Sequence, residues 1–389
     1  MDLLDLSSGD RLLLYCTRTS MDEAITQKVK GILNDRLDWD YIVETSMRHG
    51  ISPLLYWNLS RIDDGEYVPA EVMTKLRIVY YKNIAWNMLR YDELSKILIA
   101  FNDAEIDVIV LKGAFLAETI YKNIGLRPMS DIDILVRRED LQKVKKELVQ
   151  LGYAGIIYPT KWHEKLYTQW QTELKEEIQF NKHDKNVRID VHWNVQPPVI
   201  PFQIDINKFW ENAQPVKIAG VETLMLAPED LLQHLCLHLD KHINSGAIPF
   251  RWYCDIAEVI RHYEGKINWK YLVQNSKNYG IEEPIYQSLY FVNKYLGAFV
   301  PKDVLETIKT VNVNSNTDFE DIFKSSMTIE GKIKKRNQWR EINYLKRLNK
   351  IDGIWNKAHI LFGDVFPCKE FVMQRYQIQN KKLIGFYYV

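Results

Sequence analysis

The sequence has little cysteine, no long apolar run and no net charge. Its four cysteines, Cys16, Cys236, Cys254 and Cys368, are scattered and form no CxxC pair. This scatter argues against a disulfide framework or a thiolate zinc site and predicts a reducing cytoplasm. No stretch approaches 18 uncharged apolar residues, so we expect no membrane span. The first residues place acids before a short apolar run, so we expect no signal peptide.

The charges balance, with 51 Lys and Arg against 51 Asp and Glu. This balance argues against a protein that coats nucleic acid or carries an acidic tail. Apolar residues make up 46% of the sequence and aromatic residues 12%, which excludes disorder for most of the chain. The length of 389 residues predicts about two or three domains.

Helical spacing dominates the N-terminal part of the chain. It covers residues 1 to about 60, with an interruption at Ile51-Ser52-Pro53, and a polar link follows at 63–69. A long helix is then expected over 71–102. Its buried face is expected to hold Leu76, Tyr80, Ile84, Met88 and Tyr91.

The pattern then changes to short apolar runs that predict strands. These are 107–111 and 131–136, with hairpins formed by 173–181 and 187–194 and by the residues around Ala219-Gly220. A helix is expected over 138–151. From Pro228 the helical pattern resumes and fills 228–310, and the polar residues 311–320 are expected to form a link.

Three aspartates on the expected strands carry the most chemical information. Asp131 and Asp133 are two residues apart, so their side chains share a face while Ile132 and Ile134 point into the core. Paired carboxylates suit Mg²⁺, which prefers oxygen ligands and keeps positions open for phosphates. Asp190 is the best third acid, because two bound metal ions need a further carboxylate.

A family resemblance emerges from these segments together. The central runs are LKGAFLAETIY, GLRPMSDIDILV and IDVHWN, and the flanking runs are DWDYIVETSMRHGISPLLY, APEDLLQHLCLHLDKH, RWYCDIAEVI and FPCKEFVMQRY. They resemble the uncharacterised nucleotidyltransferase-like family of the polymerase β superfamily, over most of the chain. Members of that family occur beside genes for lasso-peptide biosynthesis.

The resemblance implies an α+β fold, with a polymerase-β-like core of a small mixed sheet and helices between mostly helical regions. It implies Mg²⁺- or Mn²⁺-dependent transfer of a nucleoside monophosphate from an NTP, with Asp131, Asp133 and Asp190 as catalytic metal ligands. Where the superfamily has Gly-Ser or Gly-Gly, this chain has Lys-Gly-Ala, so no serine of that turn grips the phosphate. The residues expected to contact the nucleotide are Lys112, Gly113, Arg127, Ser130 and His192.

Several of these residues have alternative interpretations. Arg127 is either a phosphate clamp or a salt-bridge partner that orients Asp131 or Asp133. His192 is a partner of the carboxylates, a base on the acceptor side or a packed histidine. The row of His234, His238 and His242 predicts a polar helix face lining the cleft, a set of structural histidines or a zinc site.

The predicted regions are 1–104 (helical), 105–226 (nucleotidyltransferase core), 227–310 (acceptor side) and 311–389 (basic and helical). Residues 331–350 contain eight Lys and Arg and one Glu. This pattern predicts either a solvated helix face or a surface that binds nucleic acid, an anionic peptide or a membrane.

Two other functions remain as alternatives. One is a tailoring enzyme that transfers a sugar from a nucleotide-sugar, or a nucleotide, to a lasso-type peptide or small molecule. The other is a non-catalytic nucleotide-binding partner protein.

Overall fold

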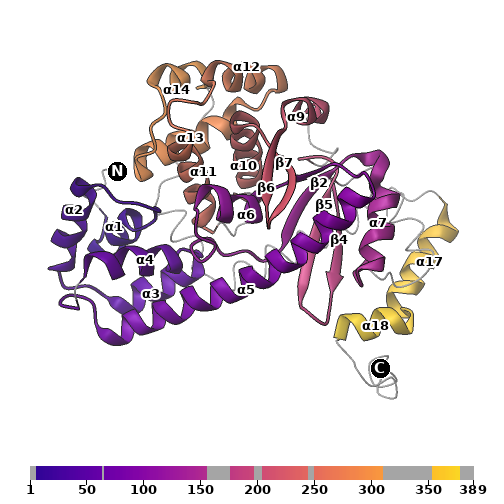
Figure 1. Cartoon of the computed structure of the whole chain (residues 1–389), viewed down its shortest axis with the longest axis horizontal. Helices are drawn as coiled ribbons and strands as arrows, with labels where there is room; N and C mark the ends of the chain where they lie inside the picture. Colours follow the sequence, from indigo (N-terminus) through magenta and orange to yellow (C-terminus); the bar gives the residue numbers. More distant parts are fainter. Residues whose placement is uncertain are drawn as a thin grey trace.

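One mixed β-sheet lies between groups of helices (Figure 1). The computed structural model describes residues 6–63, 65–155, 176–196, 204–243, 249–309 and 353–376. Strands and helices alternate irregularly along the chain, so the predicted α+β class is confirmed. The expected link at 311–320 and the basic segment 331–350 lie outside the described residues.

The N-terminal helices are short and begin at polar caps. Ser7, Asp22 and Asp38 each accept a hydrogen bond from a backbone N–H of the first turn of their helix. A proline near the start of the fourth helix explains the interruption predicted at residues 51–53. These helices are α1 (Ser8–Tyr15), α2 (Glu23–Leu33), α3 (Trp39–Arg48) and α4 (Ser52–Ile62).

The long helix α5 (Ala70–Asp103) confirms the helix predicted over 71–102, but the predicted buried face is partly wrong. Met88 is 59% exposed, whereas Asn83 and Asn87 are buried. The reason is hydrogen bonding: Asn83 donates to the carbonyl of Gly125, and Asn87 donates to the carbonyls of residues 124 and 127. Two buried amides therefore take the places that apolar periodicity gave to Ile84 and Met88.

The seven strands of the sheet lie in the order β3-β4-β5-β2-β1-β7-β6. The pairs β2–β5 and β1–β7 are parallel, and the other neighbours are antiparallel. Both predicted hairpins are present, as β4–β5 and β6–β7. The strands are β1 (Val108–Val110), β2 (Ile132–Val136), β3 (Ala154–Gly155), β4 (Glu177–Lys182), β5 (Val187–His192), β6 (Gln214–Ile218) and β7 (Val221–Met225).

Short helices connect the strands, and longer ones follow them. Between strands lie α6 (Lys112–Phe115), the π-helix η2 (Leu116–Ile120), the 3-10 helix η3 (Arg138–Asp140), α7 (Leu141–Gln150) and α9 (Ile206–Asn212). After the sheet come α10 (Pro228–Ile243), α11 (Arg251–His262), α12 (Trp269–Tyr279), α13 (Glu282–Leu296) and α14 (Lys302–Ile308). Near the end are α17 (Ile354–Val365) and α18 (Lys369–Tyr376).

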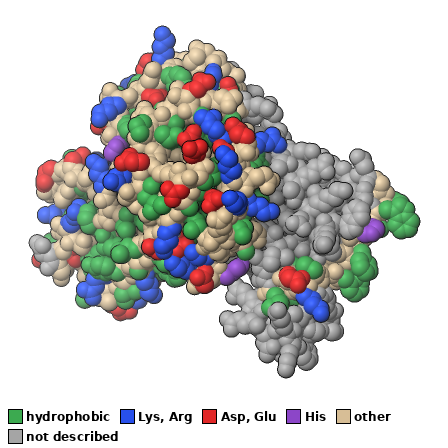
Figure 2. All heavy atoms as spheres, turned by 45° about the vertical axis from the view of Figure 1, so that its right-hand side comes forward, with side chains coloured by type: hydrophobic (Ala, Val, Ile, Leu, Met, Phe, Trp, Pro, Cys, Tyr) green, Lys and Arg blue, Asp and Glu red, His purple; other side chains and the backbone are tan. Residues whose placement is uncertain are grey.

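Buried side chains from α1 through α14 form one continuous apolar cluster. The division into four regions therefore stays a prediction. Among the described residues, no helix combines the length and hydropathy of a membrane span. Charged side chains of both signs are interspersed over the described surface in Figure 2, as expected from the balanced composition.

Candidate active site

The parallel pairing of β2 and β5 brings the predicted acids together. Asp133 lies in β2, and its register partner in β5 is Asp190, so both side chains leave the same face of the sheet. Asp131 comes directly before β2, and Ile132 and Ile134 are completely buried on the other face, as predicted. The three aspartates, together with Lys112, Arg188 and His192, are called the aspartate cluster below.

Asp133 is the buried centre of this cluster. Its Oδ1 accepts a hydrogen bond from Lys112 Nζ at 3.0 Å and lies 3.0 Å from His192 Nε2. Burial alone would raise the pKa of Asp133, but Lys112 and His192 outweigh it and hold that pKa well below its usual range. Asp133 is therefore ionised at neutral pH although it is buried.

Asp190 has the opposite tendency. Burial, followed by the negative charge of Asp133, raises the pKa of Asp190. Its Oδ1 accepts a hydrogen bond from Gln179 Nε2 at 3.1 Å and lies 3.6 Å from Arg188 Nε. Two carboxylates on neighbouring strands thus have pKa values displaced in opposite directions, which is typical of active sites.

Both carboxylate oxygens of Asp131 have protein partners. Its Oδ2 forms a close ion pair with Nη2 of Arg188, and its Oδ1 accepts a hydrogen bond from Ser130 Oγ at 3.0 Å. Arg188 therefore contacts both Asp131 and Asp190. The predicted role of Ser130 in nucleotide binding stays a prediction, and its hydroxyl is directed to the carboxylate.

Two oxygens of the cluster remain available for a cation. Among the described residues, neither Oδ2 of Asp133 nor Oδ2 of Asp190 has a hydrogen-bond or ion-pair partner. Carboxylate oxygens are the ligands Mg²⁺ prefers, so the donor chemistry fits. In the part of the chain that is described, however, no three His, Cys, Asp or Glu side chains are grouped closely enough to hold a metal ion. Asp131 is paired with Arg188 instead.

Lys112 and Gly113 follow β1, next to the aspartates. The backbone of Lys112 has a φ of 39°, which is unusual for a residue with a side chain. A Cβ on Gly113 would lie 2.6 Å from Nη1 of Arg127 and 2.9 Å from Cγ of Met129, so a larger residue would force these side chains to shift. The structure thus gives Gly113 a packing role, and its predicted contact with phosphate stays a prediction.

Arg127 does not pair with the aspartate cluster. Its Nη2 lies 2.8 Å from Oδ2 of Asp255 in α11, and its Nε donates to Asp255 Oδ1 at 3.2 Å. The hydroxyl of Tyr121 donates to the same Oδ1 at 2.9 Å. The expected salt bridge therefore exists, but its partner is Asp255 and not Asp131 or Asp133. A phosphate contact by Arg127 stays a prediction.

The histidines of α10 lie in a row, as their spacing predicts. The ring centroids of His238 and His242 are 4.7 Å apart, and both rings pack on Trp252. His234 is buried, and within the described ranges neither of its ring nitrogens has a hydrogen-bond partner. Burial, followed by the positive charge of Lys112, lowers the pKa of His234 well below its usual range, so this imidazole is neutral.

Three polar residues beside the aspartates were missed by the sequence interpretation. Arg188 lies between Asp131 and Asp190, Gln179 contacts Asp190, and Glu177 Oε2 is 3.4 Å from Nδ1 of His192. The signal was present, since alternation along 187–192 places Arg188 on the face of Asp190. The contribution of β4 needed the pairing of Gln179 with Asp190, which alternation alone does not give.

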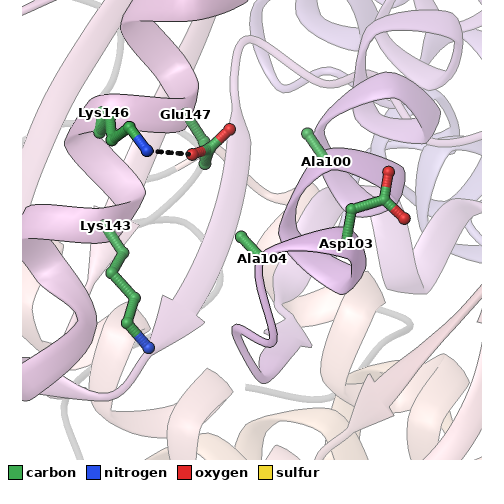
Figure 3. A pocket seen from close by; sticks show the side chains of 6 residues that line it. All are labelled: Ala100, Asp103, Ala104, Lys143, Lys146 and Glu147. Atoms are coloured by element: carbon green, nitrogen blue, oxygen red, sulfur yellow. Dashed lines mark ion pairs between the residues drawn. The ribbon is translucent and has the colours of Figure 1, made fainter.

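A hollow elsewhere on the molecule contains none of the predicted site residues. It measures about 430 Å³ and lies between the end of α5 and α7 (Figure 3). Its lining is Ala100, Asp103, Ala104, Lys143, Lys146 and Glu147. The hollow adjoins the start of β1, whereas Lys112 and the aspartates are at the other end of that strand.

Comparison with known families decides the class of the protein. Residues 35–297, more than half of the chain, match the profile of a family described as uncharacterised nucleotidyltransferase. The chain belongs to this nucleotidyltransferase family. The predicted resemblance and the prediction of a transferase are therefore confirmed at that level. The association with lasso peptides stays a prediction.

Other comparisons add little. A solution structure of the antibiotic-resistance factor ANT(2'')-Ia aligns with a TM-score of 0.35 and 12% sequence identity. The alignment covers 53% of this chain and 97% of that one. A similarity this low supports no argument about substrates. No curated protein matches the sequence.

Proposed function

We propose that this nucleotidyltransferase moves a nucleoside monophosphate from an NTP to an acceptor, with Asp131, Asp133 and Asp190 as its metal-binding carboxylates. The observation that supports the proposal is the register pairing of Asp133 with Asp190, each with one oxygen that has no partner among the described residues. Bound Mg²⁺ or Mn²⁺ would neutralise phosphate charge and activate the acceptor oxygen.

The side chains divide the remaining work. Lys112 and His192 keep Asp133 ionised, which fixes one permanent negative charge on β2. Asp190, whose pKa is raised, is the better proton acceptor for an acceptor hydroxyl. As its proton passes to Asp190, the acceptor oxygen bonds to the α-phosphorus of the NTP, and the bond to the leaving pyrophosphate breaks.

The acceptor side is assigned to α10. Burial, followed by the positive charge of Lys112, lowers the pKa of His234, and this dependence on Lys112 indicates that the buried imidazole lies near the aspartate cluster. A neutral imidazole both donates and accepts hydrogen bonds, which suits a hydroxyl-bearing acceptor, either a peptide or a small molecule. The free cysteines, three of them buried, support a cytoplasmic location.

The test is a transfer assay preceded by a binding screen. Each NTP and nucleotide-sugar is added with Mg²⁺ or Mn²⁺, and stabilisation against heat identifies the donor. Pyrophosphate release is then measured for the wild type, Asp133→Asn, Asp190→Asn and Asp107→Asn. Asp107 is an exposed aspartate at the far end of β1 and serves as the matched control. Loss of pyrophosphate release in Asp133→Asn and Asp190→Asn, but not in Asp107→Asn, supports the proposal. Unchanged release in Asp133→Asn or in Asp190→Asn contradicts it.

A further inference from the structure

Arg188 occupies an unusual position within the aspartate cluster. It stands in β5, two residues before Asp190 and on the same face of the strand. Its Nη2 pairs with Asp131, and its Nε lies 3.6 Å from Asp190. One guanidinium therefore bridges two of the three carboxylates that are proposed to bind metal.

The bridge is strong at one end and weak at the other. Nε of Arg188 is buried and makes no hydrogen bond to any described residue, because its 3.6 Å distance to Asp190 is too long for one. The side chain as a whole is 40% exposed, so it can turn outward without opening the core. Lys112 differs: its ammonium is buried and hydrogen-bonded to Asp133, which fixes it in place.

A second cation lies near Arg188. Burial, followed by the positive charge of Arg188, lowers the pKa of Arg90 on α5. The Nη2 of Arg90 donates to the carbonyl of Ser130 at 3.5 Å, which places it beside the segment that carries Asp131. Arg188 is thus held by two carboxylates while a like charge lies close by, and this repulsion favours its release once a metal ion neutralises the acids.

We propose that Arg188 is a built-in counter-cation that competes with the divalent metal ion for Asp131 and Asp190. The inference rests on the proposed function, because it assumes that these carboxylates bind metal. In the metal-free protein the guanidinium limits the repulsion between the carboxylates. Metal binding requires the guanidinium to withdraw from Asp131, which then becomes free to act as a ligand. Arg188 is a positioning residue, since it acts on the carboxylates and not on the reacting atoms.

The experiment measures Mn²⁺ binding to the full chain without nucleotide. Free Mn²⁺ is followed by electron paramagnetic resonance, and the affinity is confirmed by calorimetry. Arg188→Gln is expected to bind Mn²⁺ about tenfold more tightly than the wild type, because the competing charge is gone. Arg188→Lys keeps a positive charge that cannot bridge two carboxylates, so we expect a smaller increase in the affinity for Mn²⁺. This variant also serves as the test if Arg188→Gln folds poorly.

Two further variants are the controls. Arg137→Gln removes an arginine of similar exposure (38%) that pairs with Asp107 just beyond the other end of β2, and its Mn²⁺ affinity should equal that of the wild type. Asp133→Asn in the Arg188→Gln background should abolish the tight site. A purely structural arginine would change the melting temperature but would not increase the affinity for Mn²⁺.

The outcomes separate this inference from the proposed function. If the wild type binds Mn²⁺ through Asp133 and neither Arg188 variant binds more tightly, the counter-cation role is wrong and the metal site stands. If no protein binds Mn²⁺ in a way that depends on Asp133, both the metal site and the inference are wrong.

Discussion

Two clusters in this molecule surround carboxylates with cations, and they differ in how completely the oxygens are used. Glu93 on α5 is buried, and its Oε1 contacts Lys96 and Lys185. Its Oε2 accepts hydrogen bonds from Tyr153 and Lys182. In the aspartate cluster, by contrast, Asp133 and Asp190 each keep one oxygen without a partner among the described residues.

The number of partnered oxygens distinguishes a structural carboxylate from a functional one. A buried carboxylate whose oxygens are all satisfied stabilises the fold, because removing it strands its cations. A carboxylate that leaves an oxygen open at a polar face forgoes that stabilisation and keeps the oxygen for a ligand. Asp255, bonded through both oxygens to Arg127 and through one to Tyr121, belongs to the first class.

The largest expected effect is on the functional side of the comparison. Asp190→Asn should lower the rate of nucleotide transfer about a thousandfold, because a ligand and proton acceptor is lost. The same change should raise the free energy of unfolding by about 1 kcal/mol at pH 7. The pKa of Asp190 is raised in the folded state, so its stabilising effect is present at low pH and is lost as the carboxylate ionises. Transfer kinetics and urea unfolding measure the two effects, and a parallel loss of rate and stability would contradict this assignment.

The second prediction concerns Glu93. Glu93→Gln should lower the free energy of unfolding by about 3 kcal/mol at pH 7 and leave the transfer rate of folded protein unchanged. The hydrogen bonds from Lys185, Lys182, Tyr153 and Lys96 outweigh burial and lower the pKa of Glu93 from 4.5 to about 2. Its contribution is therefore complete above pH 4.5 and disappears as the pH falls toward 2.

Urea unfolding at several acidic pH values checks this contribution. The wild type should lose stability steeply in that interval, and the variant should show a shallower slope. Equal slopes in both proteins would show that the satisfied oxygens of Glu93 do not stabilise the fold.

The third prediction concerns Asp255, the other acid whose two oxygens are hydrogen-bonded. It tests whether Arg127, the partner of Asp255, is held rigidly beside Gly113. Gly113→Ala should lower the free energy of unfolding by about 2 kcal/mol, because the new Cβ would meet Arg127 at 2.6 Å and Met129 at 2.9 Å. Gly31→Ala is the control, since nothing lies within 4 Å of its Cβ and α2 should gain up to about 1 kcal/mol. Chemical denaturation measures both, and a stable Gly113→Ala would mean that Arg127 can move freely.

The smallest expected effect concerns Asp230, which is buried and has, in the described part of the chain, one unpaired oxygen and no cation beside it. Its Oδ2 accepts a hydrogen bond from Asn212, while burial raises its pKa to about 6. Stability should therefore fall as the pH rises from about 4 to 6. Asp230→Asn should remove this dependence and add about 1 kcal/mol at pH 7. Unfolding curves at pH 4, 5, 6 and 7 measure this dependence. If Asp230→Asn has the same pH profile as the wild type, a group other than Asp230 causes the dependence.

Much of this fold can be predicted from the sequence, because hydrophobic periodicity and turn-forming residues depend only on neighbouring positions in the chain. The strands around Val108 and Ile132, the two hairpins and the boundaries of α5 all follow from such patterns. The burial of Asn83 and Asn87 does not, because their partners are backbone carbonyls about 40 residues away. Periodicity cannot anticipate a polar side chain that is buried to serve a distant loop.

The site divides in the same way. Alternation on one strand predicts that Asp190 and His192 share a face, and the contact of His192 with Asp133 agrees with that. The partner of Arg127 could not be predicted, because Asp255 lies 128 residues further along the chain, on α11. Which distant charges pair depends on the tertiary structure, and no local stretch of the sequence shows it.

The order of the strands has a consequence for synthesis of the chain. β1 and β2 are close in sequence and can pair early, but their outer neighbours, β5 and β7, are made much later. The edge of β1 stays uncovered until residue 224 has left the ribosome, about ten seconds after residue 109 at common translation rates. Until β5 and then β7 are made, β1 and β2 each have one edge open to pairing with a strand of another chain, which is a risk of aggregation during synthesis.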